Sequence, residues 1–317
     1  MSRDADTAAP AAPGLWPVDR LLLSTLAALG ALAAACHPRP APLLLAFGAL
    51  ALFLWSSASF GPRSRAGEAL HSFAPLFVIL GIYETVGFVV GAVNPVRWDG
   101  TFAALDARLF GPIVPAWRHA LGRPSWLSDA ASIAYVSYYV VPTAMGLALY
   151  LQRRRGDFDR LAFDLQLTLV ASYAGYFLFP TAGPRVPVAQ AAVALGGGAV
   201  SEAVRLFIHT CELNDFDAFP SGHTAISLVF LADGWRMFPR WRVPLAATAA
   251  SIVFSTVYLS HHYAVDLLGG VLVAAGALAG SPYLRRALGF GARASTDPGS
   301  TEGRTAGARP RDTPGAS

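Results

Sequence analysis

FAPLFVILGIYETVGFVVGAVN, residues 73–94, is an apolar run with a single charged side chain, Glu84. A helix needs about 20 mostly apolar residues to cross the hydrocarbon core of a bilayer. This run is long enough, and its apolar and polar residues do not alternate as they would in a strand with one buried face. It therefore predicts a membrane-spanning helix.

Similar runs lie on both sides of this stretch. They are 20–36, 42–60, 127–151, 161–180, 221–238, 243–261 and 264–283, of which the first is short and rich in Ala. Only helices and closed barrels satisfy their backbone hydrogen bonds inside a bilayer, and the length of these runs favours helices. We predict an all-α fold, a polytopic membrane helix bundle with about eight transmembrane helices.

The composition agrees with a membrane protein. Hydrophobic residues make up 54% of the chain and charged residues 14%, whereas soluble domains carry about 25% charged residues. This excludes a soluble enzyme, a nucleic-acid-binding module and a disordered protein. The net charge of +4 does not indicate nucleic-acid binding, because the basic residues lie in loops between the apolar runs. All of them are Arg, which excludes mechanisms that need a Lys.

The distribution of Arg predicts the orientation. Eight spans place both termini on one side, and that side holds 17 Arg, including Arg153, Arg154 and Arg155, against 7 on the other. Cytoplasmic loops are enriched in basic residues. We therefore expect an integral protein of the plasma (inner) membrane with both termini in the cytoplasm, and with loops 95–126 and 181–220 facing outward.

Residues 98–121 are too polar to span. We predict one helix lying along the outer interface, with its apolar and charged residues on opposite faces. Three Trp residues are expected at headgroup depth. The apolar residues are Phe102, Leu105 and Leu109, the charged residues are Asp99, Asp106 and Arg108, and the Trp residues are Trp98, Trp117 and Trp126.

Three polar segments at the outer ends of predicted spans are candidates for chemistry, because ionisable groups in a membrane protein mark functional sites. Helix packing can bring all three together at one depth. The segments are 179–185 (FPTAGPR), 219–224 (FPSGHT) and 260–266 (SHHYAVD).

Residues 219–224 have the pattern of an anion-binding helix start. Ser221 is a favourable N-cap, and Gly222 lets a ligand approach the backbone. The free N–H groups and the helix dipole at such a start attract anions, and His223 would lie beside a bound anion. The plainer interpretation is an ordinary cap with a structural His.

The other two segments contribute an imidazole, a carboxylate and a guanidinium. His262 and Asp266 have the i, i+4 spacing that lets a carboxylate orient an imidazole. They could equally be a buried polar pair. Arg185 suits bidentate binding of phosphate or could anchor the chain at headgroup level. His261 is interpreted as an interfacial neighbour without a direct role.

The sequence resembles the type-2 phosphatidic acid phosphatase superfamily, or lipid phosphate phosphatases. The resemblance rests on Pro220-Ser221-Gly222-His223 followed by His262-x-x-x-Asp266. The family has three motifs, K-x(6)-R-P, P-S-G-H and S-R-x(5)-H-x(3)-D, on a six-helix core. The resemblance implies a core at 73–283, preceded by two additional transmembrane helices at 20–72 and an N-terminal tail at 1–19. Residues 290–317 are rich in Gly, Ser, Thr, Pro and Arg without an apolar period, so the composition predicts a disordered C-terminal tail.

The resemblance also implies roles for individual residues. His262 matches the nucleophile that forms a phosphohistidine, and Asp266 matches its orienting carboxylate. His223 matches the general acid, Arg185 the arginine of the first motif, and Ser221 with Gly222 the phosphate cradle. The implied partners are a membrane lipid phosphate and the bilayer. No cofactor and no metal are expected, and the sequence makes no prediction of oligomeric state.

The chain departs from the family pattern at three positions. Leu178 stands at the Lys of the first motif, Val186 at the Pro, and Thr256 at the Arg of the third motif. Together with the His-His-Tyr-x-x-Asp form of the third motif, this is similar to the inositol phosphorylceramide synthase branch, which transfers a phosphoryl headgroup to a lipid alcohol. Gly222 follows the phosphatases instead, so the acceptor is either water or a lipid alcohol.

Two alternatives and two loop features complete the predictions. A metal-dependent membrane oxidase could use His223, His261, His262 and Asp266 as ligands, but the chain has only seven His, fewer than the family pattern of di-iron desaturases needs. A non-catalytic lipid-binding or transport protein with a degenerate site is the other alternative.

Asp215 and Asp217 are interpreted as a solvated loop face that could otherwise position an acceptor hydroxyl. A glycine run at 196–198 could act as a hinge.

Overall fold

The computed structural model of the chain describes residues 14–122, 124–185, 197–211 and 214–289. Within these ranges it is helical and contains no strand, apart from one isolated bridge between Thr181 and Asp217. This confirms the predicted all-α class. The predicted C-terminal tail (290–317) and residues 1–13 of the predicted N-terminal tail lie outside the described residues.

Six helices in the described part of the chain are long and apolar enough to cross a membrane, and they correspond to six of the eight predicted spans. The other two predicted spans form α10 (Gly222–Met237) and α11 (Arg242–Tyr258). At about 1.5 Å per residue these are about 24 and 26 Å long, shorter than a hydrocarbon core of about 30 Å. The count of eight stays a prediction. The six helices are α1 (Pro17–Cys36), α2 (Ala41–Phe60), α3 (Arg65–Val93), α6 (Ser125–Leu151), α7 (Arg155–Leu178) and α12 (Ala264–Ala287).

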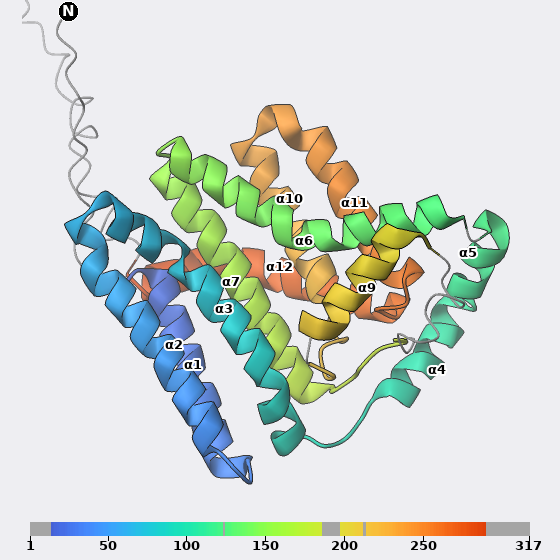
Figure 1. Cartoon of the computed structure of the whole chain (residues 1–317), viewed down its shortest axis with the longest axis horizontal. Helices are drawn as coiled ribbons and strands as arrows, with labels where there is room; N and C mark the ends of the chain where they lie inside the picture. Colours follow the sequence, from blue (N-terminus) through green and yellow to red (C-terminus); the bar gives the residue numbers. More distant parts are fainter. Residues whose placement is uncertain (1–13, 123, 186–196, 212–213, 290–317) are drawn as a thin grey trace, which may run out of the picture.

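Helices α1 and α2 lie side by side along α3 at one edge of the molecule (Figure 1), and α1 also packs against α7. A buried polar contact joins α1 to α3, because Asp19 lies 2.8 Å from the Nε2 atom of His71. Trp16 covers that imidazole at a ring distance of 4.0 Å. Since α3 begins at Arg65, the predicted core boundary at residue 73 falls inside this helix.

Helix α10 lies at the centre of the helices that carry the polar segments, and it packs against α7, α11 and α12. Phe230 and Val229 are fully buried on it. Its far end carries a buried charge network, in which Asp233 contacts Arg160 of α7 and Arg236. This network lies at the Arg-rich ends of the helices, at the end of the bundle opposite the polar segments.

Residues 98–121 form two helices, not the single helix predicted. Helix α4 (Asp99–Phe110) ends where Gly111 takes a positive φ of 63°, and α5 (Ile113–Leu121) follows Pro112. Glycine adopts this conformation without steric cost, so the Gly-Pro pair ends one helix and starts the next. Of the three Trp residues predicted at headgroup depth, Trp98 and Trp117 pack against Phe179 and Phe254, while Trp126 is exposed.

Candidate active site

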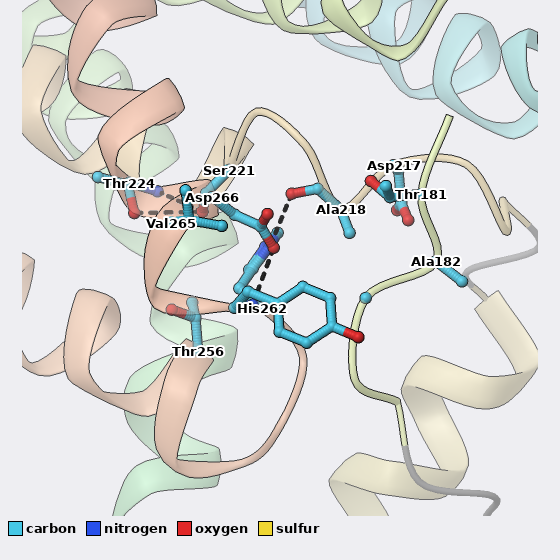
Figure 2. A network of polar contacts seen from close by, with 12 residues as sticks. Thr181, Ala182, Asp217, Ala218, Ser221, Thr224, Thr256, His262, Val265 and Asp266 are labelled. Carbon is cyan, nitrogen blue, oxygen red and sulfur yellow. Dashed lines mark hydrogen bonds and ion pairs between the residues drawn. The ribbon is translucent and has the colours of Figure 1, made fainter. Parts of the chain in front are cut away.

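The three polar segments meet at one end of the bundle. The amide of Ala218 donates to the carbonyl of Thr181 over 2.9 Å, which joins the first segment to the approach to the second. The amide of Ser221 donates to the carbonyl of Asp266 over 3.0 Å, which joins the second segment to the third. Figure 2 shows these residues converging around His262. Backbone contacts therefore fix the relative positions of the three segments.

The predicted helix start forms at the head of α10. Ser221 is the N-cap, and its Oγ accepts from the amide of Thr224 over 3.3 Å. The amides of Gly222 and His223 lie in the first turn, where a helix offers its N–H groups no carbonyl partner. The predicted phosphate cradle would therefore offer these two amides, and the Ser221 side chain caps the same turn.

Small residues on two neighbouring helices let this loop pack closely. A Cβ atom added at Gly175 of α7 would overlap the Cδ atom of Pro220. One added at Gly270 of α12 would lie 2.6 Å from the carbonyl oxygen of Ser221. Any larger side chain at either position must therefore displace the loop that carries the cradle.

Gly175→Ala tests this packing. We expect it to lower the free energy of unfolding by about 1–3 kcal/mol, the usual cost of overpacking a tight core position. The matched control is Gly276→Ala on α12, where an added Cβ meets nothing within 4 Å, and where replacing Gly in a helix stabilises slightly. The measurement is the thermal unfolding midpoint in detergent. Equal midpoints for the two variants would contradict the packing argument.

The hydrogen bonds of His262 determine its tautomer. Its Nδ1 atom lies 2.8 Å from the carbonyl oxygen of Ala218 and 3.4 Å from the Oδ2 atom of Asp266. A carbonyl oxygen only accepts hydrogen bonds, so Nδ1 carries the hydrogen and the neutral ring keeps a lone pair on Nε2. Asp266 is fully buried, and its Oδ2 also accepts from the amide of Tyr263 over 2.9 Å. The arrangement leaves Nε2 as a nucleophilic atom.

His223 faces His262 across a short gap, with 5.7 Å between the ring centroids. Tyr135 and Tyr138 contact the His223 ring at 4.3 and 4.2 Å. The Nε2 atom of His223 is buried and has no hydrogen-bond partner among the residues that the structure describes. A buried polar atom without a partner is costly, so this nitrogen is suited to a group that enters between the two imidazoles.

Arg185 does not project freely into the site. It pairs with the carboxylate of Asp217 and donates to the carbonyl of Asn214 over 3.0 Å. Asp217 in turn accepts from the hydroxyl of Tyr83 over 2.5 Å. The interpretation of Asp217 as a solvated face is therefore wrong, because the chain folds it back onto Arg185. Asp215 is exposed, as predicted.

One cavity of about 230 Å³ connects these groups. Gly222, His223, His262 and Arg185 line it, whereas Ser221 and Asp266 lie behind the lining. His261 also lines it, and burial, with smaller contributions from Arg185 and His262, lowers the pKa of His261 to about 3. His261 is therefore neutral at physiological pH and packs against Tyr135 at 4.4 Å.

The comparisons with known proteins identify the family. A family model described as PAP2 superfamily matches residues 100–280, more than half of the chain. This chain belongs to the PAP2 superfamily. The match begins at α4 and ends within α12, so it contains all three polar segments but not α1, α2 or α3.

Three curated relatives are similar to this PAP2 chain. A phosphoinositol dihydroceramide synthase of Bacteroides thetaiotaomicron is 28% identical over 56% of this chain and 65% of its own length. A PA-phosphatase related-family protein of Dictyostelium discoideum is 24% identical over 74% of this chain and 50% of its own. The inositol phosphorylceramide synthase of Candida albicans is 38% identical over 58 residues, 18% of this chain and 12% of its own. The chain thus spans less than two thirds of each relative. No solved structure matches it.

The positions at which this PAP2 chain departs from the family motifs differ in their surroundings. Leu178 is 63% exposed at the end of α7. Thr256 is buried, and its carbonyl accepts from the amides of His261 and His262 over 2.9 and 3.1 Å. The backbone of Thr256 therefore helps to hold the His262 turn. Val186 lies outside the described residues.

Sequence reasoning missed the role of α4. Asp99 accepts from the amides of Ala182 and Gly183 over 2.8 and 3.2 Å, and Asp106 accepts from the amide of Val265 over 2.9 Å. Both carboxylates were expected on a water-facing side of this helix. Their spacing of seven residues places them on one face, which is the only signal in the sequence that they could act together.

The loop at 181–220 also contains an unpredicted helix, α9 (Ala199–Cys211), which packs against α6. The amides of Gly198 and Ser201 both donate to the Oδ1 atom of Asp129 of α6, over 3.0 and 2.9 Å. The described part of the predicted glycine hinge is thus anchored to α6, and Gly196 lies outside the described residues.

Proposed function

We propose that this chain is an integral-membrane enzyme that transfers the phosphoryl group of a lipid phosphoester through a phosphohistidine on His262. The observation that carries the proposal is a pair of neighbouring imidazoles, whose ring centroids lie 5.7 Å apart. His262 keeps a lone pair on Nε2, and the Nε2 atom of His223 has no hydrogen-bond partner among the described residues.

The first step is an in-line displacement. The Nε2 atom of His262 attacks phosphorus and forms the P–N bond, while the bond from phosphorus to the leaving oxygen breaks. His223 gives its proton to that oxygen, so that the alcohol leaves neutral. The amides of Gly222 and His223 and the guanidinium of Arg185 stabilise the charge on the phosphoryl oxygens, as preorganised donors do in such reactions.

The second step reverses the proton transfer. The hydroxyl of an acceptor attacks phosphorus, its proton passes to His223, and the P–N bond breaks to restore neutral His262. Arg185 is held by Asp217, so the amides at the start of α10 must supply a larger share of the charge stabilisation than in relatives with the family's Lys and Arg. Water and an alcohol both satisfy this step.

A lipid alcohol is the second candidate for the acceptor. Two of the similar proteins are named as inositol phosphorylceramide-type synthases, and the chain shares with that branch the His261-His262-Tyr263 form of the third motif. In that case a phosphoryl headgroup would move from one lipid to another.

We infer that the site faces outward from a plasma (inner) membrane. Helix α7 begins in the Arg153–Arg155 cluster and ends at the first polar segment, so the Arg-rich loops and the site lie at opposite ends of it. The positive-inside rule places the Arg-rich end in the cytoplasm. A cysteine-labelling experiment on intact cells tests this, with one reporter Cys at exposed Asp215 and one at exposed Arg153.

The deciding experiment uses purified protein and a labelled lipid phosphate, with and without an added lipid alcohol or inositol. Release of free phosphate identifies a hydrolase, and a new labelled lipid identifies a transferase. If neither product forms with any lipid phosphate or alcohol tested while the protein still binds these lipids, the proposal fails and a non-catalytic lipid-binding role takes its place.

Asp266→Asn measures how much the carboxylate contributes. The Ala218 carbonyl already accepts from the Nδ1 hydrogen of His262, and an Asn oxygen can still accept from the Tyr263 amide. The tautomer of His262 and the turn at Tyr263 should therefore both persist in the variant. We expect kcat to fall on the order of 10²-fold, less than the roughly 10⁴-fold loss seen when an orienting Asp is the sole tautomer control. A loss as large as that of His262→Ala would contradict the claim that the Ala218 carbonyl shares with Asp266 the control of the His262 tautomer.

A further inference from the structure

The cavity that begins at the facing imidazoles continues far from them. Its lining follows α7 from Tyr176, whose hydroxyl would lie 3.5 Å from a Cβ atom at Gly222, down to Phe158. These residues are eighteen positions apart, which corresponds to about 27 Å along a helix. The hydrocarbon core of a bilayer is about 30 Å thick, so one leaflet supplies about half of this length. Measured along α7, the cavity is therefore longer than a single leaflet is deep.

The cavity has the shape of a groove with α7 at its back. Both α3 and α6 pack against α7 and form the two sides. Leu80 of α3 and Thr143 of α6 line the cavity and are also exposed at the protein surface. The groove is thus accessible from the lipid-facing side between α3 and α6. We call it the α3–α6 groove.

Its chemistry changes with depth. Near the imidazoles the lining contains tyrosines: Tyr83, Tyr135, Tyr138, Tyr139, Tyr173 and Tyr176. Deeper, the lining is mainly apolar, with Ile79, Leu165 and Leu169, although it also contains the polar side chains of Gln166 and Ser72. At the far end Phe158, Ala162 and Gly146 come together, where a Cβ atom on Gly146 would lie 3.7 Å from the Phe158 ring. A polar head and a long apolar chain would match this gradient.

We propose that the α3–α6 groove binds one hydrocarbon chain of the lipid phosphate along its whole length, past the bilayer midplane, and that Ala162, Gly146 and Phe158 set the longest chain that fits. This inference rests on the proposed function only for the position of the phosphate. Lipid tails are as apolar as the groove, so no hydrophobic gain draws the chain in. Selection is therefore by length and shape.

Gln166 provides an independent marker of depth. It lines the groove ten residues below Tyr176, about 15 Å along α7, and its side-chain oxygen is buried without a partner in the described part of the chain. The Gln166 side chain also lines the groove, so a hydrocarbon chain at this level covers an amide without offering it a hydrogen bond, which weakens binding. Only a hydrocarbon chain long enough to reach Gln166 should bind more weakly for this reason.

The first experiment compares Ala162→Phe with Ala174→Phe, a matched substitution on α7 that is exposed and outside the groove lining. The probes are octyl, dodecyl, hexadecyl and icosyl phosphate in detergent micelles. We expect Ala162→Phe to raise KM for icosyl phosphate about tenfold and to leave octyl phosphate unchanged. Ala174→Phe should leave the whole series unchanged. Identical chain-length profiles for the two variants would overturn the proposal.

The second experiment uses Gln166→Leu, which keeps the groove open and replaces the amide that lines it with an apolar side chain. Its expected effect has the opposite sign: KM for icosyl phosphate falls about tenfold, and KM for octyl phosphate does not change. This variant decides the question if Ala162→Phe does not fold. An unchanged or higher KM for the icosyl probe would show that the chain does not pass Gln166 and would overturn the proposal.

The third experiment does not depend on catalysis, and so it separates failure of this inference from failure of the proposed function. Icosyl phosphate with a diazirine at its last carbon is photolysed with the His262→Ala variant. Labelling is expected within residues 156–163 or at Gly146. Octyl phosphate with a diazirine at its last carbon should label near Tyr173 instead. Labelling of the icosyl probe confined to exposed residues such as Ala174 would show that the chain stays in the surrounding lipid.

Discussion

Replacing His262 with Ala is expected to lower the turnover of lipid phosphate on the order of 10⁵-fold, because loss of a covalent nucleophile removes nearly all of the catalysis. In this ring Nδ1 contacts Ala218 and Asp266, and Nε2 keeps the lone pair. Neither the Ala218 carbonyl nor the Asp266 carboxylate can replace it as a nitrogen nucleophile. The measurement is the initial rate in detergent or liposomes, with the folding of each variant checked by thermal unfolding.

Two further readouts separate a chemical role of His262 from a structural one. Free imidazole in solution should partly restore the activity of His262→Ala, because the cavity left by the ring admits it. Wild-type enzyme quenched with labelled substrate should carry a phosphoryl group that is lost in acid and kept in base, as a phosphohistidine is. The control is His119→Ala, at an exposed position on α5, which should keep full activity. Wild-type turnover in His262→Ala would refute the mechanism.

His223→Asn is expected to lower the rate on a lipid phosphate by about 10²–10⁴-fold, the usual contribution of a general acid. This loss should depend on the leaving group. A nitrophenyl ester leaves without a proton, so the first displacement should proceed at close to the wild-type rate. The second displacement still needs His223 as a base, so steady-state turnover should stay slow.

The expected signature of His223→Asn is a burst of nitrophenol, equal in amount to the enzyme, followed by a slow phase. The same loss on both substrates without a burst would show that His223 has a structural role, which its contacts with Tyr135 and Tyr138 would then explain. His119→Ala again serves as the control, with unchanged kinetics on both substrates expected.

Local chemistry explains which parts of the site could be predicted. The cap at Ser221 and the helix that follows it were predicted because capping depends on residues only three positions apart. The proximity of His262 to Asp266 was predicted from an i, i+4 spacing, yet α12 begins at Ala264 and His262 precedes it. The closer contact of His262 is with the Ala218 carbonyl, 44 residues away. No spacing rule reveals such a contact.

Long-range packing explains the errors. Asp217 was interpreted as solvated because a short polar loop usually faces water, but the bridge between Thr181 and Asp217 returns it to Arg185. The two carboxylates of α4 were expected to face water because an isolated amphipathic helix at an interface would turn them there. In the folded chain the loop after α7 and the first turn of α12 offer them backbone amides instead.

The sequence by itself determined that this protein is a helical membrane bundle, and it predicted that the chemistry depends on two imidazoles, a carboxylate and a helix start. Hydropathy and capping are properties of short stretches, so a single chain displays them. Only the tertiary structure decided which carbonyl holds His262, that Asp217 restrains Arg185, and that the cavity extends from the imidazoles to Phe158. These features depend on which helices pack together, and packing joins residues that the sequence keeps far apart.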